Sequence, residues 1–238
     1  MRLAHLVTRL SILAAAAVLS IGAGKPAAQA SAQSAHANWL ATIAVTPAGS
    51  HTLGNPAAPV KLVEYVSYTC PHCAHFQRQS DAPLRITYLQ PGKVQVEVRH
   101  LVRDPIDMTV AMLTNCGAPS KFFANHNLFL QGQDRWIGAA ETASEAQKAR
   151  WSTGDKASRM RAIASDFGFY AMMEQRGYDR PTVDRCLADE AMAKRLAAQT
   201  AGAQDLGVPG TPGFLLNGLL LAGTYDWQSL DSQLQARF

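Results

Sequence analysis

A short apolar run leads almost directly into two closely spaced cysteines, and this junction limits what the chain can fold into. The run spans residues 60–66 and reads Val-Lys-Leu-Val-Glu-Tyr-Val, and Cys70-Pro71-His72-Cys73 follows three residues later. Such a run predicts a strand buried on both faces of a sheet. Pro71 suits the first position of a helix, where its missing N–H is no loss. We therefore predict that a strand delivers Cys70 to the start of a helix.

The spacing of the two cysteines suits thiol–disulfide chemistry. A thiolate attacks a disulfide, and a second cysteine nearby can resolve the resulting mixed disulfide. The unpaired N–H groups at a helix start favour negative charge on Cys70. His72 adds a donor or a positive charge near that sulfur, and Cys73 lies one turn further in. A stabilised thiolate makes the disulfide oxidising, so the motif favours a donor of disulfides.

Two other interpretations of these cysteines remain open. Cys70 and Cys73 could form half of a zinc site, with His72 and His75 nearby. Against zinc, the sequence has no second Cys-x-x-Cys or His-x-x-x-His pair downstream. The pair could also be a purely structural disulfide, although a strand that runs straight into the motif favours redox work.

The rest of the chain predicts an α/β order. Alternating valines at 94, 96 and 98 indicate a second strand, so residues 60–100 form a β–α–β unit with parallel strands. No convincing strand occurs in residues 105–204, where helices are expected at 106–113, 121–130, 139–151, 159–169 and 182–199. Strands return at 213–216 and 219–222 around Asn217-Gly218, a strong hairpin signal, and Asp226 can cap a last helix over 227–237.

The first residues have the features of an export signal. Arg2 and Arg9 precede an apolar run over 10–23, and small-x-small sites follow at 28–30 and 30–32. The run is shorter than the roughly 20 residues that span a bilayer, although an uncleaved anchor is the alternative. The net charge is +4, and the signal holds three basic residues and no acid, leaving +1. No basic run indicates nucleic-acid binding.

Two segments together resemble the DsbA-like thiol:disulfide oxidoreductases of the thioredoxin superfamily. The first is Val63-Glu-Tyr-Val-Ser-Tyr-Thr-Cys-Pro-His-Cys73, and the second is Gly207-Val-Pro-Gly-Thr-Pro-Gly-Phe214. The second resembles the loop that places a cis-proline opposite the active-site cysteines. The resemblance maps this proline onto Pro212 and its partner onto Thr211, whose backbone could pair with a substrate chain. Pro209 is the alternative, because some members have valine before the cis-proline.

The resemblance covers residues 52–238 and implies a thioredoxin-like fold with an inserted all-helical domain. The expected boundaries are a signal peptide over 1–30, a linker or loosely docked N-terminal arm over 31–55, a thioredoxin-like domain over 56–104 and 205–238, and the helical insertion over 105–204. It also implies a role for Glu64, the acid behind the buried cysteine that helps to move its proton. Burial should raise the pKa of this carboxyl, unless it reaches solvent at a strand edge.

The two remaining cysteines, Cys116 and Cys186, lie in the helical region. Four cysteines allow three pairings, and the closeness of Cys70 and Cys73 favours pairing the other two with each other. A second disulfide of this kind resembles a subset of the family. The alternative is two buried free thiols, which behave as small apolar residues.

The expected function is that of an exported, periplasmic oxidoreductase that introduces disulfides into unfolded exported proteins. It should need no metal or organic cofactor and should act as a monomer. By resemblance, a DsbB-type membrane reoxidase would be its electron acceptor. The alternatives are a reductase or isomerase of the same superfamily, and a binding module that holds extended chains without redox turnover.

Overall fold

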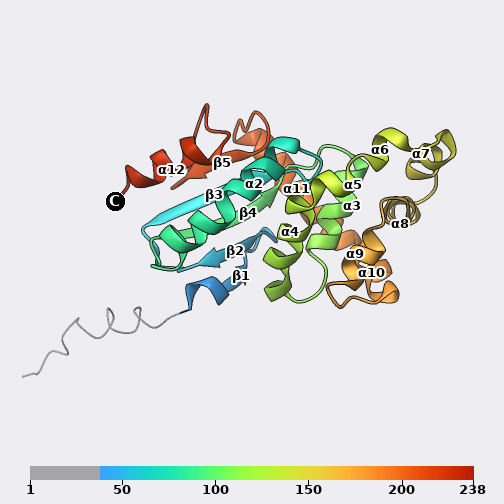
Figure 1. The fold of residues 1–238 in the computed structure, drawn as a ribbon, viewed down its shortest axis with the longest axis horizontal. Helices are drawn as coiled ribbons and strands as arrows, with labels where there is room; N and C mark the ends of the chain where they lie inside the picture. Colours follow the sequence, from blue (N-terminus) through green and yellow to red (C-terminus); the bar gives the residue numbers. More distant parts are fainter. Residues whose placement is uncertain (1–37) are drawn as a thin grey trace, which may run out of the picture. The chain divides into compact units, whose positions relative to one another are not determined.

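A mixed six-stranded sheet organises the chain in the computed structural model, which describes residues 38–238 (Figure 1). The predicted signal peptide lies outside the described residues. The strands are β1 (Ile43–Val45), β2 (His51–Gly54), β3 (Val60–Val66), β4 (Val94–His100), β5 (Gly213–Leu216) and β6 (Leu219–Leu220). Their order is β1-β2-β4-β3-β5-β6, and β3 and β4 are parallel whereas the other neighbours are antiparallel.

Strand β3 lies between β4 and β5, and its burial follows from its composition. All its residues except Lys61 are buried, as a strand with apolar side chains on both faces requires. In β4 the valines are buried and alternate with half-exposed polar residues, so one face of that strand is polar. The predicted parallel pair is confirmed, and it brings the C-terminal ends of β3 and β4 to the same edge of the sheet.

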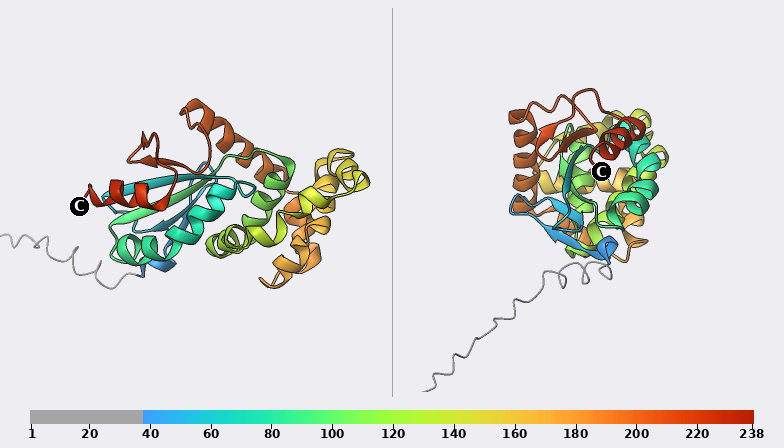
Figure 2. Two further views of the ribbon diagram at one scale, coloured as in Figure 1. Left: turned by 45° about the horizontal axis from the view of Figure 1, so that its top comes forward. Right: turned by 90° about the vertical axis from the view of Figure 1, so that its left-hand side faces the viewer.

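Helices follow in the predicted regions. They are α2 (Pro71–Pro83), α3 (Pro105–Thr114), α4 (Phe122–Gln131), α5 (Gln133–Trp136), α6 (Ala139–Thr142), α7 (Glu145–Ser152), α8 (Lys156–Asp166), α9 (Phe169–Glu174), α10 (Arg180–Leu187), α11 (Glu190–Asp205) and α12 (Trp227–Gln235). Short turns η1 (Trp39–Ala41) and η3 (Pro119–Lys121) are 3₁₀-helical, and η2 (Leu84–Leu89) is π-helical. The helices α3–α10 gather beyond one end of the sheet (Figures 1 and 2).

Two of the predicted helices, over 139–151 and 182–199, are each split in two, and the helix predicted over 159–169 ends at Asp166. Ser144 forms a capping box that starts α7, and Asp189 caps α11, so each begins a new helix inside a predicted one. Gly168 adopts a left-handed conformation, with φ 70°, between α8 and α9. The pattern of apolar residues continues across these breaks, which explains why it predicted single helices.

The expectation of a loosely docked arm is wrong for residues 43–54. Strand β2 pairs with the free edge of β4, and all four of its residues are buried. Leu53 packs into the main core, and the ring of His51 stacks on Phe122 with 4.0 Å between ring centroids. The small and polar composition of this segment hid the strand, because its partner lies more than 40 residues away in the sequence.

The C-terminal hairpin positions the segment over 207–214 against β3. Asn217 and Gly218 both have positive φ, as a tight two-residue hairpin requires, and Asn217 Oδ1 accepts a hydrogen bond from Lys61 N at 2.7 Å. The last strand is shorter than expected and ends at Leu220. Asp226 caps α12 as predicted, by accepting from Ser229 N. Within residues 38–238, no helix is long and apolar enough to cross a membrane.

Candidate active site

Cys70 and Cys73 lie where the sequence predicted, at the start of α2. Cys70 is the N-cap residue and Cys73 lies one turn into the helix. Both are free thiols, with 2% and 0% of their surface exposed. In its protonated form the Cys70 thiol donates a hydrogen bond to the carbonyl oxygen of Thr211, which lies 3.1 Å away across 141 residues of sequence.

The surroundings shift the pKa values of the two thiols in opposite directions. The pKa of Cys70 is lowered from 9.0 to about 5, mainly by a hydrogen bond from the Cys73 side chain, with contributions from the Thr211 side chain and from the positive charge of Arg103. Burial raises the pKa of Cys73 well above its ordinary value, and the hydrogen bond to Cys70 adds to the rise. The site therefore holds one thiolate and one protonated thiol near neutral pH.

The loop before β5 faces these sulfurs because of the strand register. Gly213 pairs with Tyr65 of β3, so Thr211 and Pro212 lie beside the turn that leads from β3 to Cys70. The bond between Thr211 and Pro212 is cis, and Pro209 is not part of a cis bond. Proline has no N–H, so Pro212 presents no backbone donor to the sulfurs.

Glu64 is buried in the centre of β3, with 4% of its surface exposed. Burial raises the pKa of this carboxyl from 4.5 to about 8. Its negative charge is one of the causes that raise the pKa of Cys73, so the two groups lie close enough to affect each other. A cavity of about 30 Å³ borders Glu64, Gln77 and His126, which is room for one water molecule. A role of this carboxyl in moving the Cys73 proton stays a prediction.

Pro71 and His72 are both exposed on the first turn of α2. Pro71 occupies the start of the helix, as expected. The groups that lower the pKa of Cys70 are Cys73, Thr211 and Arg103, so an action of His72 on this sulfur stays a prediction.

Sequence reasoning missed the residues that hold the turn before Cys70. Gln133 of α5 donates hydrogen bonds from Nε2 to the carbonyl oxygens of Tyr68, at 2.6 Å, and Cys70, at 3.0 Å. Arg103, Asp104 and Asp107 follow β4 and also reach this turn. The parallel β3–β4 pair was the available signal for these three, because residues that follow neighbouring parallel strands lie at the same edge. No signal pointed to Gln133.

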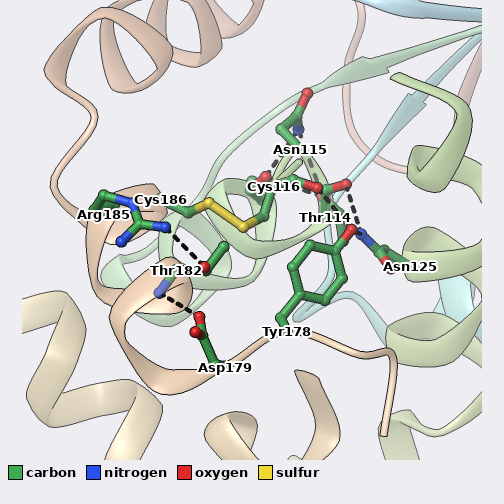
Figure 3. The surroundings of a disulfide bond; sticks show 10 residues. Thr114, Asn115, Cys116, Asn125, Tyr178, Asp179, Thr182, Arg185 and Cys186 are labelled. Carbon is green, nitrogen blue, oxygen red and sulfur yellow. Dashed lines mark hydrogen bonds between the residues drawn. A yellow bond between two sulfur atoms is a disulfide. The ribbon is translucent and has the colours of Figure 1, made fainter. Parts of the chain in front are cut away.

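Cys116 and Cys186 are joined by a disulfide, which connects the end of α3 to α10 (Figure 3). Its Cα atoms are 5.5 Å apart, and the bond closes a sequence separation of 70 residues. Beside it, the Tyr178 hydroxyl donates to the carbonyl oxygen of Cys116 at 2.9 Å and accepts from Asn125 Nδ2 at 3.1 Å. The bond lies inside the helical region and ties two of its helices together.

Two further findings concern possible ligands. Among residues 38–238, no three histidine, cysteine or acidic side chains are grouped so that they could hold a metal ion.

A cavity of about 560 Å³ lies among α3, α8 and α11, with a mostly apolar lining that includes Met108, Met112, Trp151, Met160 and Ile163. Pro105 is one of the residues that line this cavity. It directly follows Asp104, which accepts a hydrogen bond from the Thr69 hydroxyl.

Comparisons with known proteins agree with this geometry. A sequence model of the thioredoxin family matches residues 46–236. A crystal structure named protein-disulfide isomerase, from Novosphingobium aromaticivorans, is 57% identical, covers 79% of this chain and 97% of its own, and superposes with a TM-score of 0.77. Alpha-DsbA1 of Wolbachia pipientis, 18% identical, covers 81% of this chain and 92% of its own, with a TM-score of 0.64, and shows the same fold.

A relative from Rickettsia typhi, named "Putative protein-disulfide oxidoreductase RT0103", is 28% identical over 169 residues, which are 70% of this chain and 54% of the relative. The chain therefore spans about half the length of that relative. The chain belongs to the thioredoxin family and is a DsbA-like member of the thioredoxin superfamily. The predicted fold class, a thioredoxin-like sheet with a helical insertion, is confirmed.

Proposed function

We propose that the chain is a protein-disulfide oxidoreductase that donates the Cys70–Cys73 disulfide to unfolded exported proteins. The observation that carries the proposal is the opposite perturbation of two adjacent thiols. The pKa of Cys70 is lowered to about 5, whereas burial raises that of Cys73. A cysteine with a stabilised thiolate is a good leaving group, so a disulfide that contains it is readily passed on.

In the proposed reaction a client thiolate attacks the Cys70 sulfur of the oxidised pair. The Cys70–Cys73 bond breaks, a client–Cys70 mixed disulfide forms, and the electron pair leaves on Cys73, which takes up a proton. A second client thiolate then attacks the client sulfur of the mixed disulfide. The client disulfide forms, Cys70 departs as a stabilised thiolate, and two electrons have moved from client to enzyme.

Glu64 would supply the proton that Cys73 takes up. With a pKa raised to about 8 the carboxyl is mostly protonated at neutral pH, so it can donate to the departing sulfur. In the reverse direction its ionised form would accept the Cys73 proton. The neighbouring cavity with Gln77 and His126 would let water restore the protonation state of the carboxyl.

Client binding would use the Thr211–Pro212 loop beside Cys70 and the large cavity in the helical region. The Thr211 backbone, next to Pro212, can pair with an extended client segment as a short added strand. The cavity that begins at Pro105 would take apolar side chains of the same client, since methionine linings adapt to many shapes. Both surfaces suit an unfolded chain, in which backbone and apolar side chains are exposed together.

The remaining parts of the proposal rest on the sequence. The signal-like first 30 residues support export to the periplasm, and a DsbB-type membrane reoxidase would then accept the electrons. The enzyme would act as a monomer, without a metal or organic cofactor, on polypeptides rather than nucleic acid.

A second candidate is isomerisation of incorrect disulfides, favoured by the name of the relative from Novosphingobium aromaticivorans.

The experiment that tests disulfide donation is a redox titration of Cys70 and Cys73 against glutathione, read by alkylation and mass spectrometry so that Cys116 and Cys186 are scored separately. A potential of about −120 to −180 mV supports donation of disulfides, and one near about −270 mV, like that of thioredoxin, overturns it.

A matched assay separates the enzyme from a module that only binds extended chains. We expect Cys70→Ser to abolish oxidation of a reduced client peptide while binding of that peptide persists. Reactivation of a client with scrambled disulfides, faster than oxidation of the same reduced client, would instead favour the isomerase.

A further inference from the structure

Arg103, in the loop between β4 and α3, lies against the turn that ends at Cys70. Its guanidinium Nε donates a hydrogen bond to Ser67 Oγ at 3.0 Å, and its Nη2 donates to Thr69 Oγ1 at 3.3 Å. These two hydroxyls belong to the turn that ends at Cys70. The guanidinium is therefore held against the residue that directly precedes the reactive cysteine.

The two hydroxyls can accept from Arg103 because their own protons are used elsewhere. Ser67 Oγ donates to Asp107 Oδ2 at 2.6 Å, and Thr69 Oγ1 donates to Asp104 Oδ2 at 2.6 Å. A hydroxyl has a single proton, so once it donates to a carboxylate only its lone pairs remain for other partners. Each carboxylate thus orients a hydroxyl oxygen toward the guanidinium. We call Ser67, Thr69, Asp104 and Asp107 the hydroxyl relay.

The backbone fixes both carboxylates of the relay. Asp107 is buried, which raises the pKa of its carboxyl from 3.8 to about 7, and it also accepts from Tyr68 N at 2.7 Å and from Arg103 N at 3.0 Å. Asp104 caps α3 by accepting from Asp107 N at 2.8 Å. No ion pair within residues 38–238 includes Arg103, so the relay positions its charge without neutralising it through a direct carboxylate contact.

We propose that Arg103 is the positioning residue whose positive charge stabilises the Cys70 thiolate, and that the hydroxyl relay sets its place. The inference rests on the proposed function for its purpose, since a stabilised Cys70 is the group that leaves in disulfide donation. The attraction between the charge of Arg103 and this sulfur is one of the causes of the low Cys70 pKa. Arg103 itself is exposed, so its effect should have the modest size of a charge interaction near solvent.

The test measures thiolate absorbance at 240 nm against pH in the reduced protein. We expect Arg103→Gln to raise the Cys70 pKa by about half a unit, roughly a threefold change in the thiolate-to-thiol ratio. Arg103→Lys should restore part of the effect, because it keeps the charge but lacks the two-pronged donor. Arg185→Gln is the matched control: its guanidinium also donates to a threonine hydroxyl, that of Thr182, but on α10.

Variants that change no charge test the relay itself. Ser67→Ala and Thr69→Val should each raise the Cys70 pKa when Arg103 is present and have little effect in the Arg103→Gln background. A purely structural effect of the same variants would be equal in both backgrounds. Thermal unfolding, followed by circular dichroism, identifies any variant that does not fold, and Thr69→Val, at a partly exposed site, then carries the test without Ser67→Ala.

The result that overturns the proposal is equally specific. It fails if Arg103→Gln leaves the Cys70 pKa within 0.1 of its original value, on the order of the precision of such titrations, or if the relay variants act equally without Arg103. Either result leaves the proposed function intact, because that function is judged by the potential and by client oxidation. Conversely, a thioredoxin-like potential would refute disulfide donation even if Arg103 sets the Cys70 pKa as expected.

Discussion

Replacing Glu64 with glutamine should make the protein more stable near neutral pH and slower as an enzyme. Burial raises the pKa of this carboxyl from 4.5 to about 8, so the folded state holds it protonated while the unfolded chain ionises it. Between these two values the wild-type protein loses about 1.36 kcal/mol of stability for each pH unit. Glutamine has a similar shape and does not titrate, so it escapes this loss.

The stability difference between Glu64→Gln and the wild-type protein depends on pH. Below pH 4.5 the carboxyl is neutral in both states, and the stability difference between variant and wild type is constant. From pH 4.5 to 7 the difference should move in favour of Glu64→Gln by roughly 3 kcal/mol, and it should level off above pH 8. Titration of the cysteines contributes to both proteins, so it cancels in the comparison.

The stability assay is urea unfolding of the reduced protein at pH 4.5, 6, 7 and 8. Glu141→Gln is the matched control, because it removes an exposed carboxyl from α6 and should change stability by less than about 0.5 kcal/mol throughout. In parallel, the rate at which the client–Cys70 mixed disulfide forms, trapped by acid and measured by mass spectrometry, should fall on the order of 100-fold in Glu64→Gln. A stability difference that is flat with pH would refute the burial of an acid in this strand. An unchanged rate of formation would refute the proton transfer alone.

Three further predictions follow from the site and the helical region. The thiolate absorbance of the reduced protein should titrate with a midpoint near pH 5 and vanish in Cys70→Ser. Replacing Cys116 and Cys186 with alanine together should lower the free energy of urea unfolding by about 4 kcal/mol, the chain-entropy value for a loop of 70 residues. Ala193→Phe, which fills the large cavity, should raise the KM for a client peptide about tenfold and spare the reaction with a small thiol, whereas Ala201→Phe, outside the cavity lining on the same helix, should change neither.

Most of the fold could be predicted from local patterns of apolar and polar residues in the sequence. The run over 60–66 and the alternation over 94–98 predicted β3 and β4, because the side chains of a strand report directly on which faces are buried. The strands before residue 55 were missed, since β2 is buried only through its pairing with β4 and its own composition is small and polar. Splits within the helical region were missed because a cap such as Ser144 interrupts the backbone without interrupting the apolar pattern.

The residues of the candidate site that lie close together in the sequence could likewise be predicted, whereas those that the fold brings together could not. Cys70, Cys73 and Glu64 could be read from one contiguous segment, and their burial agrees with that reading. Thr211, 141 residues away from Cys70, came only through resemblance, because strand register alone brings it to the sulfur. The parallel pairing of β3 and β4 could have placed Arg103 near this turn, but its hydrogen bond to Ser67 could not be predicted, since it depends on how a single hydroxyl is oriented.

The helical insertion helps to hold the turn that presents Cys70 at the edge of the sheet. Three connections meet at the reactive edge of the sheet: the turn from β3 to α2, the loop from β4 to α3, and the loop from α11 to β5. The insertion contacts the same edge through Gln133, which donates hydrogen bonds to the backbone carbonyls of Tyr68 and Cys70 and so holds the turn that presents Cys70. The Cys116–Cys186 disulfide ties α3, which begins at the relay, to α10. Reducing that bond should therefore loosen the active-site turn as well as the helices, and hydrogen exchange at Tyr68 and Cys70 would detect it.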